Sequence, residues 1–300
     1  MTSGRYWHIQ FIASGGFAEV YKAVDPQTWG VVAIKRLTDS SADNRRRFKR
    51  ERDMLQIHLS NPFVVDILDS DLTAESPYLV LEYSELGSLQ KYVAERRDWT
   101  RIARWLYDVA FGLAIIHERG DVIRDIKPAN LLRFKREDGS ELIKITDFGL
   151  GQRPDASSGP MTASPFGTQG YIDPMAQFTQ NVTSASDIYS LGITMTELLT
   201  GNKNGRGLIP GPPPFRDLIA SMTHWNPSLR PIARAIADTV AGILQESSPA
   251  VATSVGATGA VLFCLGAAAL AVLGASANNW DRGAQRYRDS RGQFRSGLFF

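Results

Sequence analysis

The chain has 300 residues, of which 43% are hydrophobic and 21% charged, and its formal net charge is +2. This composition is typical of a globular protein, and the near-neutral charge argues against a dedicated nucleic-acid-binding protein. The single cysteine, Cys264, excludes an intramolecular disulfide and a cysteine-based metal cluster. The first residues lack the apolar core of a signal peptide, so we expect the N-terminal domain to stay in the cytoplasm.

The first third of the sequence predicts mainly β-strands. Strand-forming runs occupy residues 8–12, 19–24, 29–35 and 78–83, whereas residues 42–59 have a helical composition. From residue 99 onward, apolar residues recur at the spacing of one helical face: Ile102, Trp105, Leu106, Val109, Leu113 and Ile116. A loop rich in Gly and Pro follows at 200–215. The pattern predicts an α+β protein with two lobes around a cleft.

Two short motifs contain the residues best suited to chemistry. Residues 123–130 read Ile-Arg-Asp-Ile-Lys-Pro-Ala-Asn, and Asp147 begins an Asp-Phe-Gly triplet. Asp147 and Asn130 offer the hard oxygen ligands that Mg²⁺ prefers. Asp125 is then free to orient an acceptor hydroxyl and take its proton, while Lys127 can reach a transferring phosphate. The spacing predicts a site for phosphoryl transfer.

A lysine and a glutamate in the first third extend this set. Lys35 ends a predicted strand and Glu51 lies on the predicted helix, so an ion pair between them would hold Lys35 against the α and β phosphates. Each residue alone also fits an ordinary structural role: a surface ion pair worth under ~1 kcal/mol, a turn at Asp147, or a helix cap at Asn130. The mutually consistent positions of these polar residues favour the catalytic interpretation.

In this order the motifs resemble those of the eukaryotic-type (Hanks-type) Ser/Thr protein kinases, over residues 6–245. The resemblance rests on a glycine-rich turn, Val32-Ala33-Ile34-Lys35, Glu51, the catalytic loop at residues 123–130, the metal loop Asp147-Phe148-Gly149, Gly167-Thr168, Asp187 and Arg230. It implies a bilobal protein-kinase fold with a small β-rich N-terminal lobe and a larger helical C-terminal lobe. It also implies ATP and Mg²⁺ as cofactors, with Mn²⁺ as an alternative ion. Lys127 and Thr168 match the Ser/Thr class.

The resemblance assigns roles to individual residues. The predicted catalytic residues are Asp125, Lys127, Lys35 and Glu51, and the predicted metal ligands are Asn130 and Asp147. The predicted nucleotide-binding residues are Ile12, Gly15, Val20, Ala33, Lys35, Glu82, Ser84 and Leu132. Among these, the apolar side chains would enclose the adenine and the backbone of Glu82 and Ser84 would form the hinge contacts, with Leu81 as gatekeeper. For Leu81 and Leu132, plain core packing remains an equally good interpretation. Asp187 would brace the catalytic loop.

Three departures from the family pattern stand out. The glycine-rich turn carries Ala13 and Ala18 where the family usually has Gly, which would weaken close phosphate approach at the first position. Ile123 replaces a His that packs beneath the metal loop; we expect it to pack against Phe148 without hydrogen bonding. Met175 replaces a Glu that normally pairs with the arginine at 230, so Arg230 needs another partner, for which Asp173 is a candidate.

The sequence also suggests regulation by phosphorylation. Arg124 directly precedes Asp125, a pattern associated with phosphorylation of the activation loop. The candidate acceptors in that loop are Ser157, Ser158, Thr162 and Ser164. The basic stretch 45–52 is either a solvated helix face or a second reader of the loop phosphate that couples it to Glu51.

The C-terminal region differs in character. A linker at 246–254 precedes residues 255–275, which contain no charge and would span ~31 Å as a helix, about the thickness of a bilayer core. We therefore expect one C-terminal hydrophobic transmembrane helix, with small residues suited to self-association. A buried soluble helix or a re-entrant segment are the alternatives. Residues 276–300 form a basic tail that we expect to be flexible.

Together these features predict a membrane-anchored, single-pass Ser/Thr protein kinase with its kinase domain in the cytoplasm. Its partners would be protein substrates and the membrane, with no nucleic acid. Three alternatives remain open at this point: a pseudokinase or signalling scaffold, a small-molecule kinase, and a membrane adaptor. The Gly167-Thr168 segment and Asp187 argue against a small-molecule kinase.

Overall fold

The computed structural model describes residues 5–94, 98–151, 167–205 and 209–247, and the backbone of 280–281, 286–288 and 294–296. The chain divides into a unit Met1–Ser247 and a unit Ser248–Phe300. The second unit contains an antiparallel sheet in the order β10-β9-β8, with β8 at Trp280–Asp281, β9 at Arg286–Arg288 and β10 at Phe294–Ser296. These strands lie in the predicted basic tail, whose sequence has no alternation and so predicts no strand.

The N-terminal part of the first unit is a five-stranded antiparallel sheet in the order β1-β2-β3-β5-β4. Its strands are β1 (Trp7–Ser14), β2 (Ala18–Val24), β3 (Val31–Leu37), β4 (Ile67–Asp71) and β5 (Tyr78–Glu82). The β-branched residues of β3 explain its central position: Val32 and Ile34 are buried while the intervening side chains are more accessible. The register pairs Val20 with Lys35 and Ala33 with Leu81.

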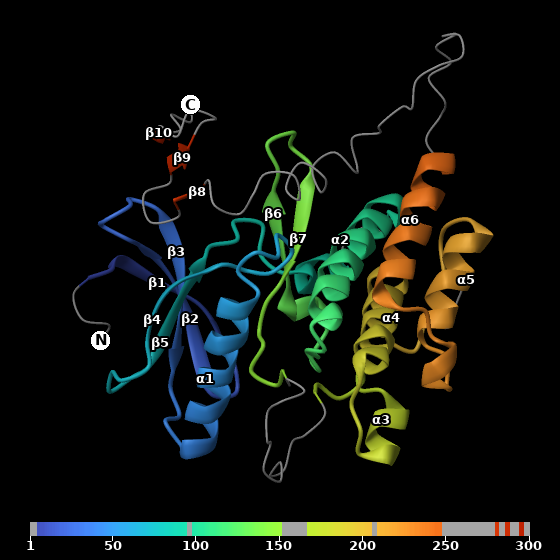
Figure 1. Cartoon of the computed structure of the whole chain (residues 1–300), viewed down its shortest axis with the longest axis horizontal. Coiled ribbons are helices and arrows are strands. Elements are labelled where there is room, and N and C mark those ends of the chain that lie inside the picture. Colours follow the sequence, from blue (N-terminus) through green and yellow to red (C-terminus); the bar gives the residue numbers. More distant parts are fainter. Residues whose placement is uncertain are drawn as a thin grey trace. The chain divides into compact units, whose positions relative to one another are not determined.

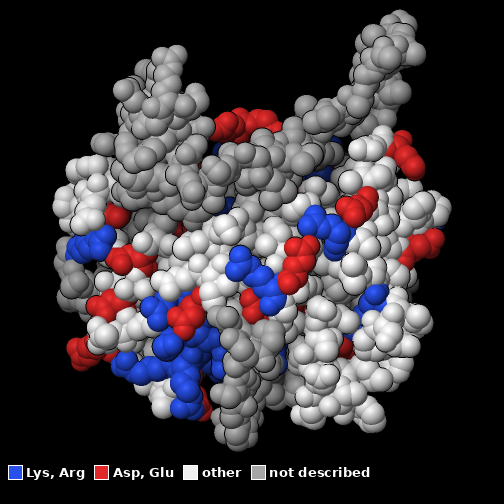
Figure 2. All heavy atoms as spheres, viewed as in Figure 1, with Lys and Arg blue, Asp and Glu red and all other residues white. Residues whose placement is uncertain are grey.

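One helix, α1 (Ala42–Ile57), accompanies this sheet (Figure 1). It buries Phe48, Glu51, Met54 and Leu55 on one face. A buried glutamate in that apolar stripe is unusual and requires a partner. Lys and Arg side chains gather over the exposed part of α1 (Figure 2), which carries Arg45, Arg46, Arg47, Lys49, Arg50 and Arg52.

The rest of the first unit is mainly helical in the ranges that the structure describes (Figure 1). The helices are α2 (Trp99–Glu118), α3 (Pro174–Thr179), α4 (Ser184–Thr200), α5 (Pro213–Met222) and α6 (Ala233–Ser247). Three short 3₁₀ turns accompany them: η1 (Leu89–Ala94), η2 (Pro128–Asn130) and η3 (Pro227–Leu229). A hairpin of β6 (Leu131–Lys135) and β7 (Glu141–Ile145) lies between the five-stranded sheet and the helices. Asp98 caps α2 by accepting from the backbone N–H of Thr100 and Arg101.

A strand-rich part followed by a helical part, joined by one buried hydrophobic cluster, confirms the predicted bilobal α+β fold. The predicted helix at 42–59 is present as α1. The predicted loop at 200–215 is shorter than expected, because α5 begins at Pro213, where proline is favourable in a first turn. Across the described ranges no helix has both the length and the apolar character needed to cross a bilayer. The predicted span 255–275 lies outside those ranges.

Candidate active site

The catalytic loop places Asp125 at the centre of a hydrogen-bond network. Its Oδ2 accepts from Lys127 Nζ at 2.7 Å and from Asn130 Nδ2 at 3.0 Å. Its Oδ1 accepts from both the backbone N–H (3.0 Å) and the hydroxyl (2.7 Å) of Thr168. Lys127 also donates to Thr168 Oγ1 at 2.6 Å. Three residues thus donate to one carboxylate, and one of them, Thr168, comes from 43 residues further along the chain.

A second cluster joins the sheet, α1 and the metal loop. Lys35 Nζ, on β3, lies 2.7 Å from both carboxylate oxygens of Glu51 on α1 and 3.3 Å from Oδ1 of Asp147. Glu51 is fully buried, and Lys35 is the partner that its position in the apolar stripe of α1 requires. The interpretation of Lys35 and Glu51 as an exposed surface pair is therefore excluded.

The electrostatics of this cluster follow from burial and from mutual attraction. Burial acts to lower the pKa of Lys35, but the carboxylates of Asp147 and Glu51 outweigh it and raise that pKa, so the ammonium stays charged. Burial would raise the pKa of Asp147, yet Lys35 and Lys127 hold it below its ordinary value. Burial raises the pKa of Glu51 to about 7 against the pull of Lys35. Asp147 is thus an ionised carboxylate, as a metal ligand must be.

The residues present fit a divalent cation of the Mg²⁺ type. Asp147 and Asn130 supply hard oxygen atoms, and the side-chain nitrogen of Asn130 is engaged with Asp125, which leaves its carbonyl oxygen as the free ligand atom. The described residues contain no cluster of three or more His, Cys, Asp or Glu side chains able to hold a metal by themselves. This donor set matches a cation that keeps waters and shares its coordination with phosphates.

Asp187 braces the catalytic loop from α4. Its carboxylate is fully buried and accepts from the backbone N–H groups of Ile123 (2.9 Å) and Arg124 (2.8 Å). His117 Nε2 of α2 lies 2.9 Å from the same carboxylate. Arg124 has a left-handed backbone with φ of 72°, a conformation that costs about 1–3 kcal/mol for a residue with a side chain and needs such support. Asp147 is also left-handed, with φ of 65°.

Gly167 is the first described residue after position 151, and it allows the chain there to approach the catalytic loop closely. Its φ is +108°, and a Cβ built on it would lie only 2.4 Å from the backbone oxygen of Arg124. Any other residue would therefore push Thr168 away from Asp125. Gly167 is thus a requirement of backbone packing at this point.

The predicted nucleotide-binding residues line the sheet and the β6–β7 hairpin. Ala33 and Leu132 are partly buried at the edge of the main hydrophobic cluster, whereas Ile12 on β1 is 45% exposed. Val20 lies opposite Lys35 in the register of β2 and β3, and Gly15 forms the turn between β1 and β2 by donating to Ala18 O at 2.7 Å.

The predicted hinge residues Glu82 and Ser84 make hydrogen bonds to neighbouring segments. The backbone N–H of Glu82 donates to Asp66 O, and its carboxylate pairs with Lys144. The hydroxyl of Ser84 donates to Arg133 O, whereas its backbone N–H makes no hydrogen bond to another described residue.

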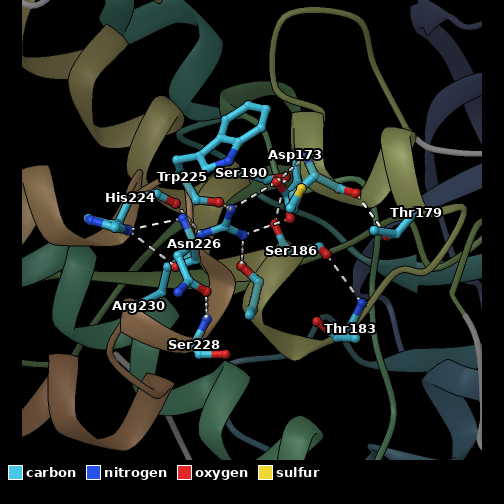
Figure 3. Close-up of polar contacts among 12 residues, drawn as sticks. Asp173, Thr179, Thr183, Ser186, Ser190, His224, Trp225, Asn226, Ser228 and Arg230 are labelled. Atoms are coloured by element: carbon cyan, nitrogen blue, oxygen red, sulfur yellow. Dashed lines mark hydrogen bonds and ion pairs between the residues drawn. The ribbon is translucent and has the colours of Figure 1, made fainter.

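The structure resolves the question of the partner of Arg230. Asp173 accepts two hydrogen bonds from its guanidinium, at 2.6 and 2.9 Å, and both side chains are almost wholly buried (Figure 3). The remaining donors reach the backbone oxygens of His224, Ala185 and Trp225. Asp173 also caps α3 by accepting from the N–H of Met175 at 3.0 Å. It thus provides the carboxylate that Met175 does not.

Two residues outside the predicted site list belong to it. Thr168 contacts both Asp125 and Lys127, and His117 contacts the bracing Asp187. The Gly-Thr pair in the sequence is a usable signal for Thr168. No local pattern marks His117, because its role depends on the packing of α2 against α4.

The comparisons with known proteins agree with this geometry. Residues 6–207 match the family model described as protein kinase domain. The serine/threonine-protein kinase PknL of Mycobacterium tuberculosis is 32% identical over 256 residues, which cover 77% of this chain and 63% of the relative. An L-type lectin-domain containing receptor kinase V.5 of Arabidopsis thaliana is 33% identical over 65% of this chain and 30% of the relative. A protein named probable serine/threonine-protein kinase in Clostridium perfringens is 34% identical over 67% of this chain and 29% of the relative.

This chain therefore spans less than two thirds of the length of each of these relatives. The matched family model covers most of the chain and spans the predicted catalytic, nucleotide-binding and metal-binding residues. By its sequence and by the arrangement of its site, the chain belongs to the protein kinase family.

Proposed function

We propose that this protein transfers the γ-phosphoryl group of ATP to Ser or Thr hydroxyls of proteins. The observation that supports this most strongly is the convergence of Asp125, Lys127, Asn130 and Asp147 with the buried pair of Lys35 and Glu51. Phosphoryl transfer needs positioning and charge neutralisation more than covalent chemistry, and these residues supply both. The names of the relatives support the Ser/Thr class.

Each side chain has a role in this proposal. Lys35, held by Glu51, binds the α and β phosphates. Asp147 and Asn130 hold Mg²⁺, which when bound neutralises charge on the β and γ phosphates. Asp125 already accepts four hydrogen bonds, about the capacity of a carboxylate. When Lys127 moves from Oδ2 to the transferring phosphate, it leaves an acceptor site on Asp125 for the substrate hydroxyl.

The experiment that tests this proposal is transfer of label from ATP to protein by the purified chain in the presence of Mg²⁺. The matched control is Asp125→Asn, which keeps the size of the side chain and removes its basicity. We expect wild type to label Ser or Thr residues and the variant to lose at least 100-fold in rate. Equal labelling by both proteins would contradict the role of Asp125, and no labelling by wild type would contradict the proposed activity and favour the scaffold alternative.

We also propose that phosphorylation of the activation loop regulates the enzyme. The predicted acceptors Ser157, Ser158, Thr162 and Ser164 lie outside the described residues. Support comes from the basic face of α1 in Figure 2 and from Arg124, whose pKa is lowered first by burial and also by the nearby charge of Arg50. A phosphate would relieve the repulsion between these guanidinium groups. If Thr162→Ala/Ser164→Ala activates to the wild-type level after incubation with ATP, this part is wrong.

Finally, we propose that residues 255–275 form a single transmembrane helix that keeps the kinase domain in the cytoplasm and contributes to self-association. The support is the absence of charge over 21 residues and the small side chains within them. A chain ending at residue 247 is the matched control in a membrane fractionation. We expect the full chain in the membrane fraction and the shorter chain outside it; equal distribution would contradict the anchor.

A further inference from the structure

A buried histidine at the end of α1 packs against Phe148 of the metal loop. His58 follows α1 directly, and its side chain is 1% exposed. Its ring stacks on that of Phe148, with centroids 6.1 Å apart and planes inclined by 23°. Phe148 is itself fully buried and follows Asp147 in the chain. The sequence predicts no functional role for His58.

A carboxylate sets the orientation of this ring. Asp121, also buried, places its Oδ2 3.0 Å from Nε2 of His58. Asp121 lies just beyond α2, where its backbone N–H donates to Ile116 O, and four residues before Asp125. The backbone N–H of His58 continues α1 by donating to Met54 O. One side-chain contact thus joins the end of α1 to the segment that leads into the catalytic loop.

A polar pair at this position has a cost that simple packing would avoid. Burying an imidazole and a carboxylate removes both from water, and two apolar side chains would fill the same space without that penalty. What a hydrogen bond adds is a fixed orientation of the ring plane, as it does for histidines that bind metals. The ring so fixed is the one on which Phe148 stacks.

The residue before Arg124 differs from the family pattern, and this difference bears on the role of His58. In the family pattern a His there packs beneath the metal loop, whereas this chain has Ile123. Ile123 is fully buried in the same hydrophobic cluster as Phe148 but has no polar side-chain atom. His58 therefore brings a hydrogen-bonded ring to Phe148 from α1 instead of from the catalytic loop.

We propose that His58, oriented by Asp121, is a positioning residue whose ring holds Phe148, and through it Asp147, in the place required for Mg²⁺ binding. This inference rests on the proposed function of Asp147. It implies that the metal loop moves together with α1, because His58 lies at the end of the helix that carries Glu51. Displacement of α1 would then disturb the Lys35 ion pair and the metal ligand together.

The test uses the full chain and the variant His58→Leu/Asp121→Leu, which removes both polar partners and leaves no unpaired charge. The main readout is the Mg²⁺ concentration that half-saturates the Mg²⁺-dependent binding of a fluorescent ATP analogue. We expect it to rise about tenfold, the effect typical of lost support around a metal ligand, while binding of the analogue in EDTA changes less than twofold. The rate of transfer should fall in parallel.

The matched control is Ile243→Ala, which removes a buried side chain on α6 and lowers the melting temperature without touching the metal loop. It should leave the Mg²⁺ requirement unchanged. An unchanged Mg²⁺ requirement in the double variant would overturn the inference.

If the double variant does not fold, His58→Gln keeps a partner for Asp121 but removes the ring. A wild-type Mg²⁺ requirement in that variant would overturn the inference as well. Because the binding readout does not depend on turnover, failure of the proposed activity in wild type is distinguishable from failure of this inference.

Discussion

The buried pair of Asp173 and Arg230 gives the sharpest test of how this fold is stabilised. Asp173→Ala would leave the guanidinium buried with two of its five hydrogen bonds lost (Figure 3). Breaking a buried ion pair from one side costs about 3–5 kcal/mol. The same substitution removes the cap of α3, worth about 1 kcal/mol. The expected loss in the free energy of unfolding is therefore about 4–6 kcal/mol.

Asp173→Asn separates these two contributions. The amide keeps an oxygen for the N–H of Met175 but loses the charge and one acceptor toward Arg230, so we expect about 3 kcal/mol. Adding Arg230→Met removes the unpaired cation. The double variant should then be less destabilised than the sum of the two single variants by about 2 kcal/mol or more.

Urea unfolding followed by circular dichroism measures these differences, with Glu118→Ala as the matched control. Glu118 pairs with Arg234 at 3.3 Å on the surface, where both side chains are well exposed, so its loss should cost under ~1 kcal/mol. The reasoning is refuted if Asp173→Asn lowers the free energy of unfolding no more than Glu118→Ala does. It is also refuted if the loss in the double variant equals the sum of the losses in the two single variants.

Three further predictions concern the catalytic loop and α2. Gly167→Ala should destabilise the fold by about 1–3 kcal/mol and reduce the rate of transfer, because its Cβ would meet the Arg124 carbonyl; normal turnover would contradict this. Thr168→Ala should lower kcat about 10- to 100-fold with little change in the KM for ATP, and Thr168→Ser should restore it. Burial raises the pKa of Asp108 to about 6, so the folded state holds that proton to a higher pH than the unfolded state does. The stability of wild type relative to Asp108→Asn should therefore fall by about 2 kcal/mol between pH 4 and pH 7, as measured by denaturant titration; a flat difference would contradict it.

The sequence predicts which side chains lie close together most directly where they share one loop. Asp125, Lys127 and Asn130 are close in sequence, so their proximity follows from one loop. Lys35 and Glu51 are distant in sequence, and the structure brings them to 2.7 Å, which the motif order anticipates.

Other contacts depend on tertiary packing that no local pattern encodes. Asp173 is only a candidate partner for Arg230 in the sequence, since the two residues are 57 positions apart and their contact depends on how the start of α3 meets the end of η3. His58 carries no motif at all, and its role becomes visible only when the end of α1 meets Phe148 and Asp121. The strands β8 to β10 are short and lack alternation, so backbone pairing rather than side-chain pattern defines them.

The brace at Asp187 has a consequence for the time scales of motion in the site. Its carboxylate lies on α4 inside the core and accepts hydrogen bonds from the backbone N–H groups of Ile123 and Arg124. Ligand binding does not need to move this helix. Opening those bonds requires the catalytic loop to separate from α4, which breaks into the buried hydrophobic cluster that Ile123 shares with α4. In hydrogen exchange these two amides should therefore exchange as slowly as the helix cores, with or without nucleotide. The position of the catalytic base is thus set by the folding of the helical part of the first unit and not by ligand binding.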